Sequence, residues 1–142
     1  MIIINILWRR KMEELFNLGI SLPTLGSMLE LNPEIKDMSN AFIQEKIELL
    51  KLIKCSDNQI INIISSNSLY LSKTKEEYLE LVNYLTKLEF NTLNILFDSN
   101  PYILNLEPYE IEEYINSKKN NGELIEDIVD ELDSNPYLFS EI

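Results

Sequence analysis

Apolar residues recur along this chain at the three- and four-residue spacing of an amphipathic helix, in segments separated by short polar stretches. Four of these segments each run up to an asparagine, and their apolar positions are Leu22, Leu25, Met28 and Leu29; Ile60, Ile61, Ile63 and Ile64; Leu93, Ile95 and Leu96; and Leu124, Ile125, Ile128, Val129 and Leu132. The pattern predicts four helices that all end at the same kind of residue.

The four asparagines mark an internal repeat. They are Asn32, Asn67, Asn100 and Asn135, with separations of 35, 33 and 35 residues. Around Asn100 and Asn135 the chain reads DSNPY both times, and only Asn67 lacks the following proline. Periods in the mid-thirties are typical of stacked helical hairpins.

A second helix is predicted after each of the first three asparagines, over residues 40–54, 75–89 and 108–119, and a leading helix of the same kind over 6–19. Thr74 and Glu77 form a predicted capping box, Pro108 suits a first helical turn, and Gly19 and Gly122 suit helix ends. The predicted N-caps of the first helices are Ser21, Ser56 or Asp57, Asn91, and Asn121.

The repeated Asn-Pro has a structural explanation. A proline pushes the preceding residue out of the helical region, so the first helix of each hairpin stops at the asparagine, which can then cap a short turn into the second helix. In this reading DSNPY is a corner rather than a catalytic motif. Tyr70, Tyr102 and Tyr137 belong to these corners, where we expect them to pack.

The predicted fold class is all-α, an α-solenoid of helical hairpins with about three and a half repeats of 33–35 residues. We expect one domain over 1–142, and its handedness stays open. Its predicted parts are a leading helix (1–19), repeats at 20–55, 56–90 and 91–122, and a terminal half repeat (123–142). A start at Met12 rather than Met1 is an open alternative.

Apolar residues also fall three, ten and seventeen positions past the corner proline or its Ser68 equivalent, most clearly at Leu71, Tyr78 and Leu85. The other two copies have Lys36, Ile43 and Leu50, and Leu104, Ile111 and Lys118. Over about residues 20–140 this pattern resembles the mitochondrial transcription termination factor (mTERF) repeat. The resemblance implies helix pairs with a short third turn, curved around a concave face that binds nucleic acid through basic residues.

Charge departs from that expectation. The net charge is −12; residues 1–88 carry 10 basic and 11 acidic side chains, whereas residues 89–142 carry 2 and 13. An acidic region of this kind repels nucleic-acid phosphates, which proteins neutralise with lysine and arginine. The carboxylates of the run 123–133 alternate with apolar residues at helical spacing, so we interpret them as a solvated helix face and not a metal site.

Catalytic and targeting signals are few. The chain has no histidine, only three glycines and one cysteine, Cys55, which removes His-based catalysis, His or multi-cysteine metal sites and glycine-rich phosphate loops. We therefore predict no enzyme activity and no cofactor, with Cys55 as a buried small hydrophobe. The apolar start (1–8) is too short to cross a membrane, and the prediction is a cytoplasmic protein.

The favoured functional hypothesis is an adaptor or regulator whose acidic C-terminal third binds a basic protein. The predicted contact residues are Tyr109, Glu110, Glu113, Tyr114, Glu126 and Asp130. One alternative is that the charge serves only solubility. Another is nucleic-acid binding of the mTERF type, through Arg9, Arg10, Lys11, Lys46, Lys51, Lys54, Lys73, Lys75 and Lys87.

Overall fold

The computed structural model describes residues 12–142, and every regular element among them is a helix. This confirms the all-α fold class, an α-solenoid of helical hairpins. Residues 12–142 divide into two compact units, one that ends at Ser72 and one over Lys73–Ile142. Their boundary lies inside the predicted repeat 56–90, between its corner and its second helix. The first part of the predicted leading helix, residues 6–11, lies outside the described residues, and the alternative start at Met12 stays open.

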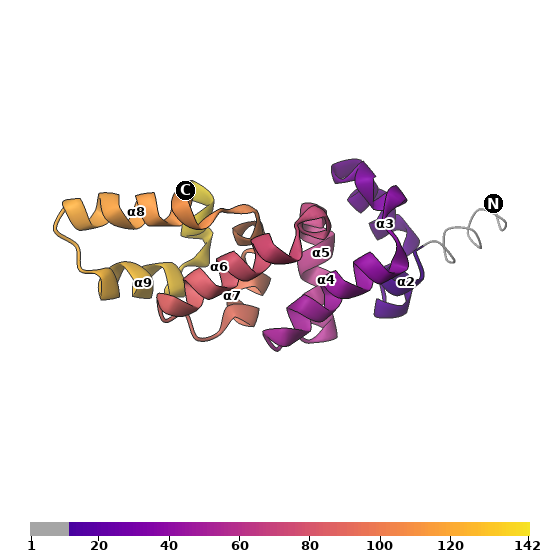
Figure 1. Ribbon diagram of the computed structural model, residues 1–142, viewed down its shortest axis with the longest axis horizontal. Coiled ribbons are helices and arrows are strands. Elements are labelled where there is room, and N and C mark those ends of the chain that lie inside the picture. Colours follow the sequence, from indigo (N-terminus) through magenta and orange to yellow (C-terminus); the bar gives the residue numbers. More distant parts are fainter. Residues whose placement is uncertain (1–11) are drawn as a thin grey trace. The chain divides into compact units, whose positions relative to one another are not determined.

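In the first unit, equivalent helices of successive repeats pack on each other (Figure 1): α2 contacts α4, α3 contacts α5, and the corner turn η1 contacts η2. The elements are α2 (Glu13–Leu18), α3 (Leu22–Leu31), the 3₁₀ turn η1 (Pro33–Asp37), α4 (Asn40–Leu52), α5 (Asp57–Ser66) and the 3₁₀ turn η2 (Ser68–Ser72).

In the second unit, α6 contacts α8 and η3 contacts η4. The helices α8 and α9 lie side by side (Figure 1). Its elements are α6 (Lys75–Lys87), α7 (Leu93–Ser99), the 3₁₀ turn η3 (Pro101–Asn105), α8 (Pro108–Asn120), α9 (Ile125–Ser134) and the 3₁₀ turn η4 (Pro136–Glu141). The predicted second helices are thus confirmed to within two residues at each end.

All four corner asparagines stop a helix in the same backbone conformation, with φ between −131° and −143° and ψ between 72° and 87°. The predicted stops are confirmed. Asn67 adopts this conformation without a following proline, so the proline is not required for the stop. Ser68, in the proline position, instead donates a hydrogen bond from Oγ to the carbonyl oxygen of Met28 at 3.0 Å, which ties this corner to α3.

The corner asparagine also connects one corner to the next. Asn32 Nδ2 donates to the carbonyl oxygen of Ser68 at 2.9 Å and to Ser72 Oγ at 2.8 Å. In the second unit, Asn100 Nδ2 donates to the carbonyl oxygen of Pro136 at 3.0 Å and to Ser140 Oγ at 2.9 Å. The partners lie 36 and 40 residues ahead in both cases. The asparagine is therefore a bond between repeats as well as a helix stop.

The predicted capping role of the asparagine is confirmed at one corner. Asn100 Oδ1 accepts a hydrogen bond from the backbone N–H of Tyr102 at 3.2 Å, at the start of η3. The side chains of Asn32 and Asn135 make no such bond at η1 and η4. Bonding to the next corner is thus the more regular use of this side chain.

The second helices all end in the same way. Gly19, Lys54, Glu89 and Gly122 follow α2, α4, α6 and α8 with φ of 116°, 70°, 72° and 91°. After each, the next backbone N–H bonds the carbonyl oxygen five residues back, as from Phe90 to Leu85 at 3.1 Å. This is the Schellman arrangement, and it confirms the predicted roles of Gly19 and Gly122. Lys54 and Glu89 hold a conformation that favours glycine.

Helix starts were predicted with mixed success. Ser21 caps α3, Ser56 caps α5, and Thr74 with Glu77 forms the predicted capping box of α6. The prediction of Asn91 is wrong by one residue, since Thr92 precedes α7. The prediction of Asn121 is wrong by three residues.

The start of α9 is displaced because the preceding helix uses the same residues. The N–H groups of Gly122 and Glu123 bond the carbonyl oxygens of Lys119 and Lys118, at 2.9 and 3.2 Å, and complete the end of α8. The residue before α9 is therefore Leu124, whose side chain makes no capping bond.

Corner tyrosines differ in burial. Tyr70 is completely buried, and its hydroxyl donates to the carbonyl oxygen of Lys46 at 2.7 Å. Tyr102 and Tyr137 are 55% and 64% exposed, so the prediction that they pack is wrong for both. They stand one position earlier after the asparagine than Tyr70, and in a 3₁₀ turn one residue rotates the side chain by about 120°. Ile103, in the position of Tyr70, is buried instead.

Among other sequence-level predictions, Cys55 is buried as expected, at 8% exposure. Three residues assigned to apolar helix faces are exposed instead: Leu22 at 39%, Ile95 at 54% and Leu124 at 64%. Leu22 and Leu124 stand at helix starts, where the packed face has not yet begun, and α7 turns Leu93, Leu96 and Phe97 inward rather than Ile95.

Candidate functional site

Charge is divided unevenly between the two units. Residues 73–142 contain 5 basic and 16 acidic side chains, a net charge of −11, whereas residues 1–72 contain 7 and 8, a net of −1. Almost the whole charge of the protein therefore belongs to the second unit, and the carboxylates gather on α8 and α9.

The six predicted contact residues lie on these two helices. On α8, Tyr109 is 57% exposed and Glu113 is exposed, while Glu110 is half-buried and accepts a hydrogen bond at Oε1 from the backbone N–H of Glu107 at 3.0 Å. Tyr114 is half-buried, with Lys118 Nζ 5.6 Å from its ring centroid. On α9, Glu126 and Asp130 are exposed.

Three of these residues line two grooves of the second unit. Tyr109 lines a groove of about 320 Å³ between α6, η3 and the first turn of α8, which we name the α6–α8 groove. Glu126 and Asp130 line a groove of about 420 Å³ between the end of α6 and α9, which we name the α6–α9 groove. Neither groove is lined by Glu110, Glu113 or Tyr114.

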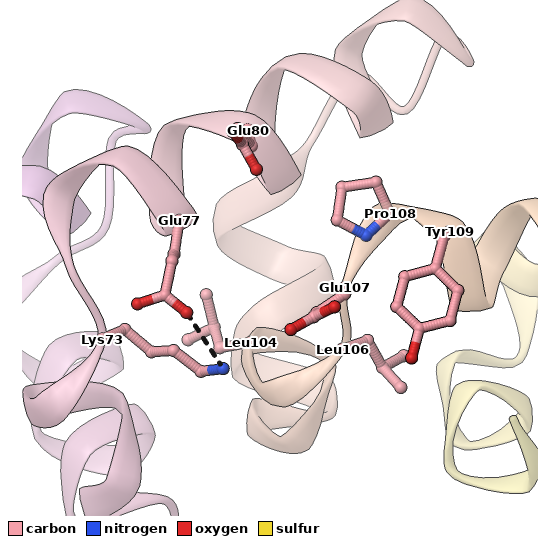
Figure 2. Close-up of a pocket in the computed structure, with 8 residues that line it drawn as sticks. All are labelled: Lys73, Glu77, Glu80, Leu104, Leu106, Glu107, Pro108 and Tyr109. Atoms are coloured by element: carbon pink, nitrogen blue, oxygen red, sulfur yellow. Dashed lines mark ion pairs between the residues drawn. The ribbon is translucent and has the colours of Figure 1, made fainter.

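The α6–α8 groove combines acids with an apolar wall. Figure 2 shows Glu77 and Glu80 of α6 facing the segment that leads into α8, with Lys73 paired to Glu77 at an Nζ–Oε2 distance of 3.9 Å. The remaining lining residues are Leu104, Leu106, Glu107, Pro108 and Tyr109. Their arrangement provides an anionic hollow beside an exposed aromatic ring.

The α6–α9 groove is built on the end of α6. Leu88, Ile125 and Val129 provide its apolar surface, and Lys87, Glu89, Asn91, Glu126 and Asp130 its polar surface. Glu89 reaches this groove from its left-handed backbone position after α6.

One titratable group of the second unit is clearly perturbed. Burial, and to a smaller extent the Glu112 carboxylate of α8, raises the pKa of the Tyr84 hydroxyl on α6. A carboxylate opposes the formation of a second negative charge nearby. Tyr84 therefore stays protonated and neutral at physiological pH.

The cations of the nucleic-acid alternative are less available than the sequence indicated. Lys46 is completely buried on α4, with Nζ 4.8 Å from the ring centroid of Phe42, so its prediction as a surface cation is wrong. Lys51 lies 3.5 Å from a carboxylate oxygen of Glu48, and Lys54 is exposed. The predicted cations at residues 9–11 lie outside the described residues.

Sequence reasoning did not assign three acidic lining residues of the α6–α8 groove, Glu77, Glu80 and Glu107, to any site, and it named Lys73 only as a cation of the nucleic-acid alternative. Glu77 and Glu80, at i and i+3, lie on one face of the predicted helix, and that signal was available. Nothing local indicated that the start of α8 would face them.

Over residues 12–142, which the structure describes, no helix is long and apolar enough to cross a membrane. Across the same residues, no group of three or more acidic or cysteine side chains has a geometry that could hold a metal ion.

Hairpins repeated every 33 to 35 residues and bonded corner to corner define an α-helical repeat protein of the solenoid class. The chain belongs to the mTERF family, whose sequence profile matches residues 7–105. This confirms the resemblance seen in the repeats. Comparison with curated proteins and with solved structures found no match.

Proposed function

We propose that this protein is a non-enzymatic, cytoplasmic helical-repeat regulator of the mTERF family whose acidic second unit binds a basic protein. One observation carries the proposal: the carboxylates gather beyond the family match. Residues 106–142 hold 11 acidic and 2 basic side chains, and all six predicted contact residues lie there. What the family repeats have in common therefore does not account for the acidic surface.

Physical properties of this surface suit a protein partner. A surface of one charge sign attracts an oppositely charged partner and speeds encounter. Tyr109, exposed among carboxylates, supplies the rigid aromatic contact on which interfaces often depend. A repeat architecture also offers an extended surface along which another chain can lie.

Affinity capture from the native cell tests the proposal. The wild type is compared with a variant carrying lysine at Glu110, Glu113, Glu126 and Asp130, after circular dichroism has shown equal helicity. We expect the variant to lose a set of basic proteins that the wild type retains at low salt and releases as salt rises.

A matched control changes the net charge by the same amount outside the acidic surface. Glu13, Glu30, Glu45 and Asp57 of the first unit are exposed and suit this purpose as lysine variants. The control is expected to capture the same proteins as the wild type. If all three forms capture the same proteins with the same salt sensitivity, the acidic surface is not the binding site.

The second candidate function is nucleic-acid binding, which the family match favours. Among the described residues, the cations it would use are exposed Lys51, Lys54, Lys75 and Lys87 and half-buried Lys73. Fluorescence polarisation at low salt with labelled single- and double-stranded DNA and RNA separates the two functions. Our proposal expects no binding at micromolar protein, whereas binding that weakens steeply with salt would favour the alternative.

A further inference from the structure

The α6–α8 groove has two unlike walls. One is a face of α6 with Glu77 and Glu80, together with Lys73 just before this helix, and the other is the segment from Leu106 to Tyr109 that enters α8 (Figure 2). Leu104, only 3% exposed, contributes to the lining from η3. The packing of α6 against α8 brings the two walls together within one compact unit.

The α6–α8 groove has a net negative charge, which favours binding of a cation. Three carboxylates, on Glu77, Glu80 and Glu107, line it together with one ammonium group, on Lys73. The Lys73–Glu77 pair is long, at 3.9 Å, and the Glu77 side chain is 48% exposed, so the pair is a weak surface ion pair. Two carboxylates remain in excess over the cation.

The apolar wall selects among cations. Leu106 and Pro108 offer aliphatic surface, and the Tyr109 ring is 57% exposed beside them. A guanidinium group is planar, stacks on aromatic rings and bonds carboxylates with two parallel N–H groups, while its methylene stem packs on apolar surface. A lysine ammonium group offers neither the planar stacking nor the paired donors.

The volume limits what can enter. At about 320 Å³ the groove is at the lower end of the range of small-molecule sites, which runs from roughly 300 to 1,000 Å³. A single long side chain fits such a space, whereas an entire helix requires a longer groove.

We propose that the α6–α8 groove binds an arginine side chain of a basic protein partner, with Glu80 and Glu107 facing the guanidinium group and Tyr109 stacking on it. The identity of the occupant as a partner's side chain rests on the proposed function, while arginine binding by the groove is tested independently of it.

The direct test is a titration of the ¹⁵N-labelled full chain with N-acetyl-arginine amide, in which binding is monitored by chemical-shift changes of the backbone amides. We expect saturable shifts at the backbone amides of Glu80, Leu106, Glu107 and Tyr109. N-acetyl-citrulline amide, a neutral molecule of nearly the same shape, should cause none. Equal shifts with both probes, or shifts spread evenly over the acidic residues, would overturn the proposal.

Two variants make the test specific. Glu80→Gln with Glu107→Gln keeps the side-chain shapes and should weaken arginine binding more than about tenfold, because charge-assisted hydrogen bonds are lost. Tyr109→Ala should weaken it by less. The control, Asp127→Asn with Glu131→Gln on exposed positions of α9, makes the same change in net charge and should bind like the wild type. Equal weakening in the Gln pair and the control would refute a specific groove.

A labelled nona-arginine peptide separates this proposal from the proposed function. If the peptide binds the wild type and the Gln pair equally, the acidic unit binds basic chains but the groove is not their arginine site. If N-acetyl-arginine amide binds at the groove but the nona-arginine peptide does not bind, the arginine site is supported and the proposed protein-binding function is wrong.

Discussion

The corner asparagine allows a prediction with a control inside the same sequence. Asn100 and Asn135 both stand in DSNPY, with nearly the same backbone conformation. Asn100 is 6% exposed and donates two hydrogen bonds from Nδ2, to Pro136 and Ser140. Asn135 is exposed, and its side chain makes no capping bond at η4. Asn100→Asp keeps the shape of the side chain but replaces the donor by an oxygen.

The cost follows from the two lost bonds. Each bond contributes about 1 kcal/mol net to the free energy of unfolding. The carboxylate oxygen that is left facing the Pro136 carbonyl oxygen destabilises the folded state by about 1 kcal/mol or more in addition. We expect Asn100→Asp to lower the free energy of unfolding by about 2–4 kcal/mol, and Asn135→Asp to change it by less than about 0.5 kcal/mol.

Urea unfolding, monitored by circular dichroism at 222 nm, measures both changes in the free energy of unfolding. The comparison requires that the substitutions leave unchanged the slope of this free energy against urea concentration. A double-mutant cycle of Asn100→Ala and Ser140→Ala then isolates one bond, with an expected coupling of about 0.5–1.5 kcal/mol. If Asn100→Asp costs no more than Asn135→Asp, the asparagine does not stabilise the contact between corners and our reasoning is refuted.

Three further predictions concern single residues of the second unit. Glu89→Gly should raise the free energy of unfolding by about 1 kcal/mol, because Glu89 has φ of 72°; an unchanged urea midpoint would contradict this. Thr74→Ala should lower the free energy of unfolding by about 1 kcal/mol, because the Thr74 side chain caps α6. Thr92→Ala should lower it only slightly, because the Thr92 side chain makes no capping bond. Equal decreases for the two variants would contradict the capping argument. Glu112→Gln should lower the pKa of the Tyr84 hydroxyl, but this pKa should remain above the ordinary 10.0 because burial is the larger cause of its rise. The pKa is measured from absorbance at 295 nm, with Tyr84→Phe identifying the contribution of this tyrosine. A pKa of Tyr84 that Glu112→Gln leaves unchanged would contradict the prediction. Because the folded state holds this proton more tightly, the stability that Tyr84 contributes is complete below pH 10.0 and is lost as pH rises through the raised pKa.

Several helix ends could be predicted because their chemistry is local. Ser56 and Thr74 each meet their capping partners three residues away, and Gly19 ends α2 through bonds to the preceding turn. The failure at Asn121 has a local cause as well, because an Asn-Gly pair suits both the end of one helix and the approach to the next. In this structure the Asn-Gly pair belongs to the end of α8.

Side-chain burial was less predictable. Tyr70 and Tyr102 differ by a single position within their corners, yet one is buried and the other exposed. Lys46 has the sequence context of a solvated helix residue, and it is completely buried. Both outcomes depend on which neighbouring element covers a given face, and the spacing of residues along one helix carries no such information.

By itself the sequence determined the period of the repeat, the positions of the helices and the uneven charge, because helix periodicity, capping and composition act over a few residues. The tertiary structure decided what the asparagines bond to, since Ser68 and Pro136 lie 36 residues beyond their partners. It also decided that Glu80 and Tyr109 line one groove, since only the packing of α6 on α8 brings their two walls together. Hydrogen bonds and grooves require atoms from separate repeats to meet in space, and chain order does not specify that meeting.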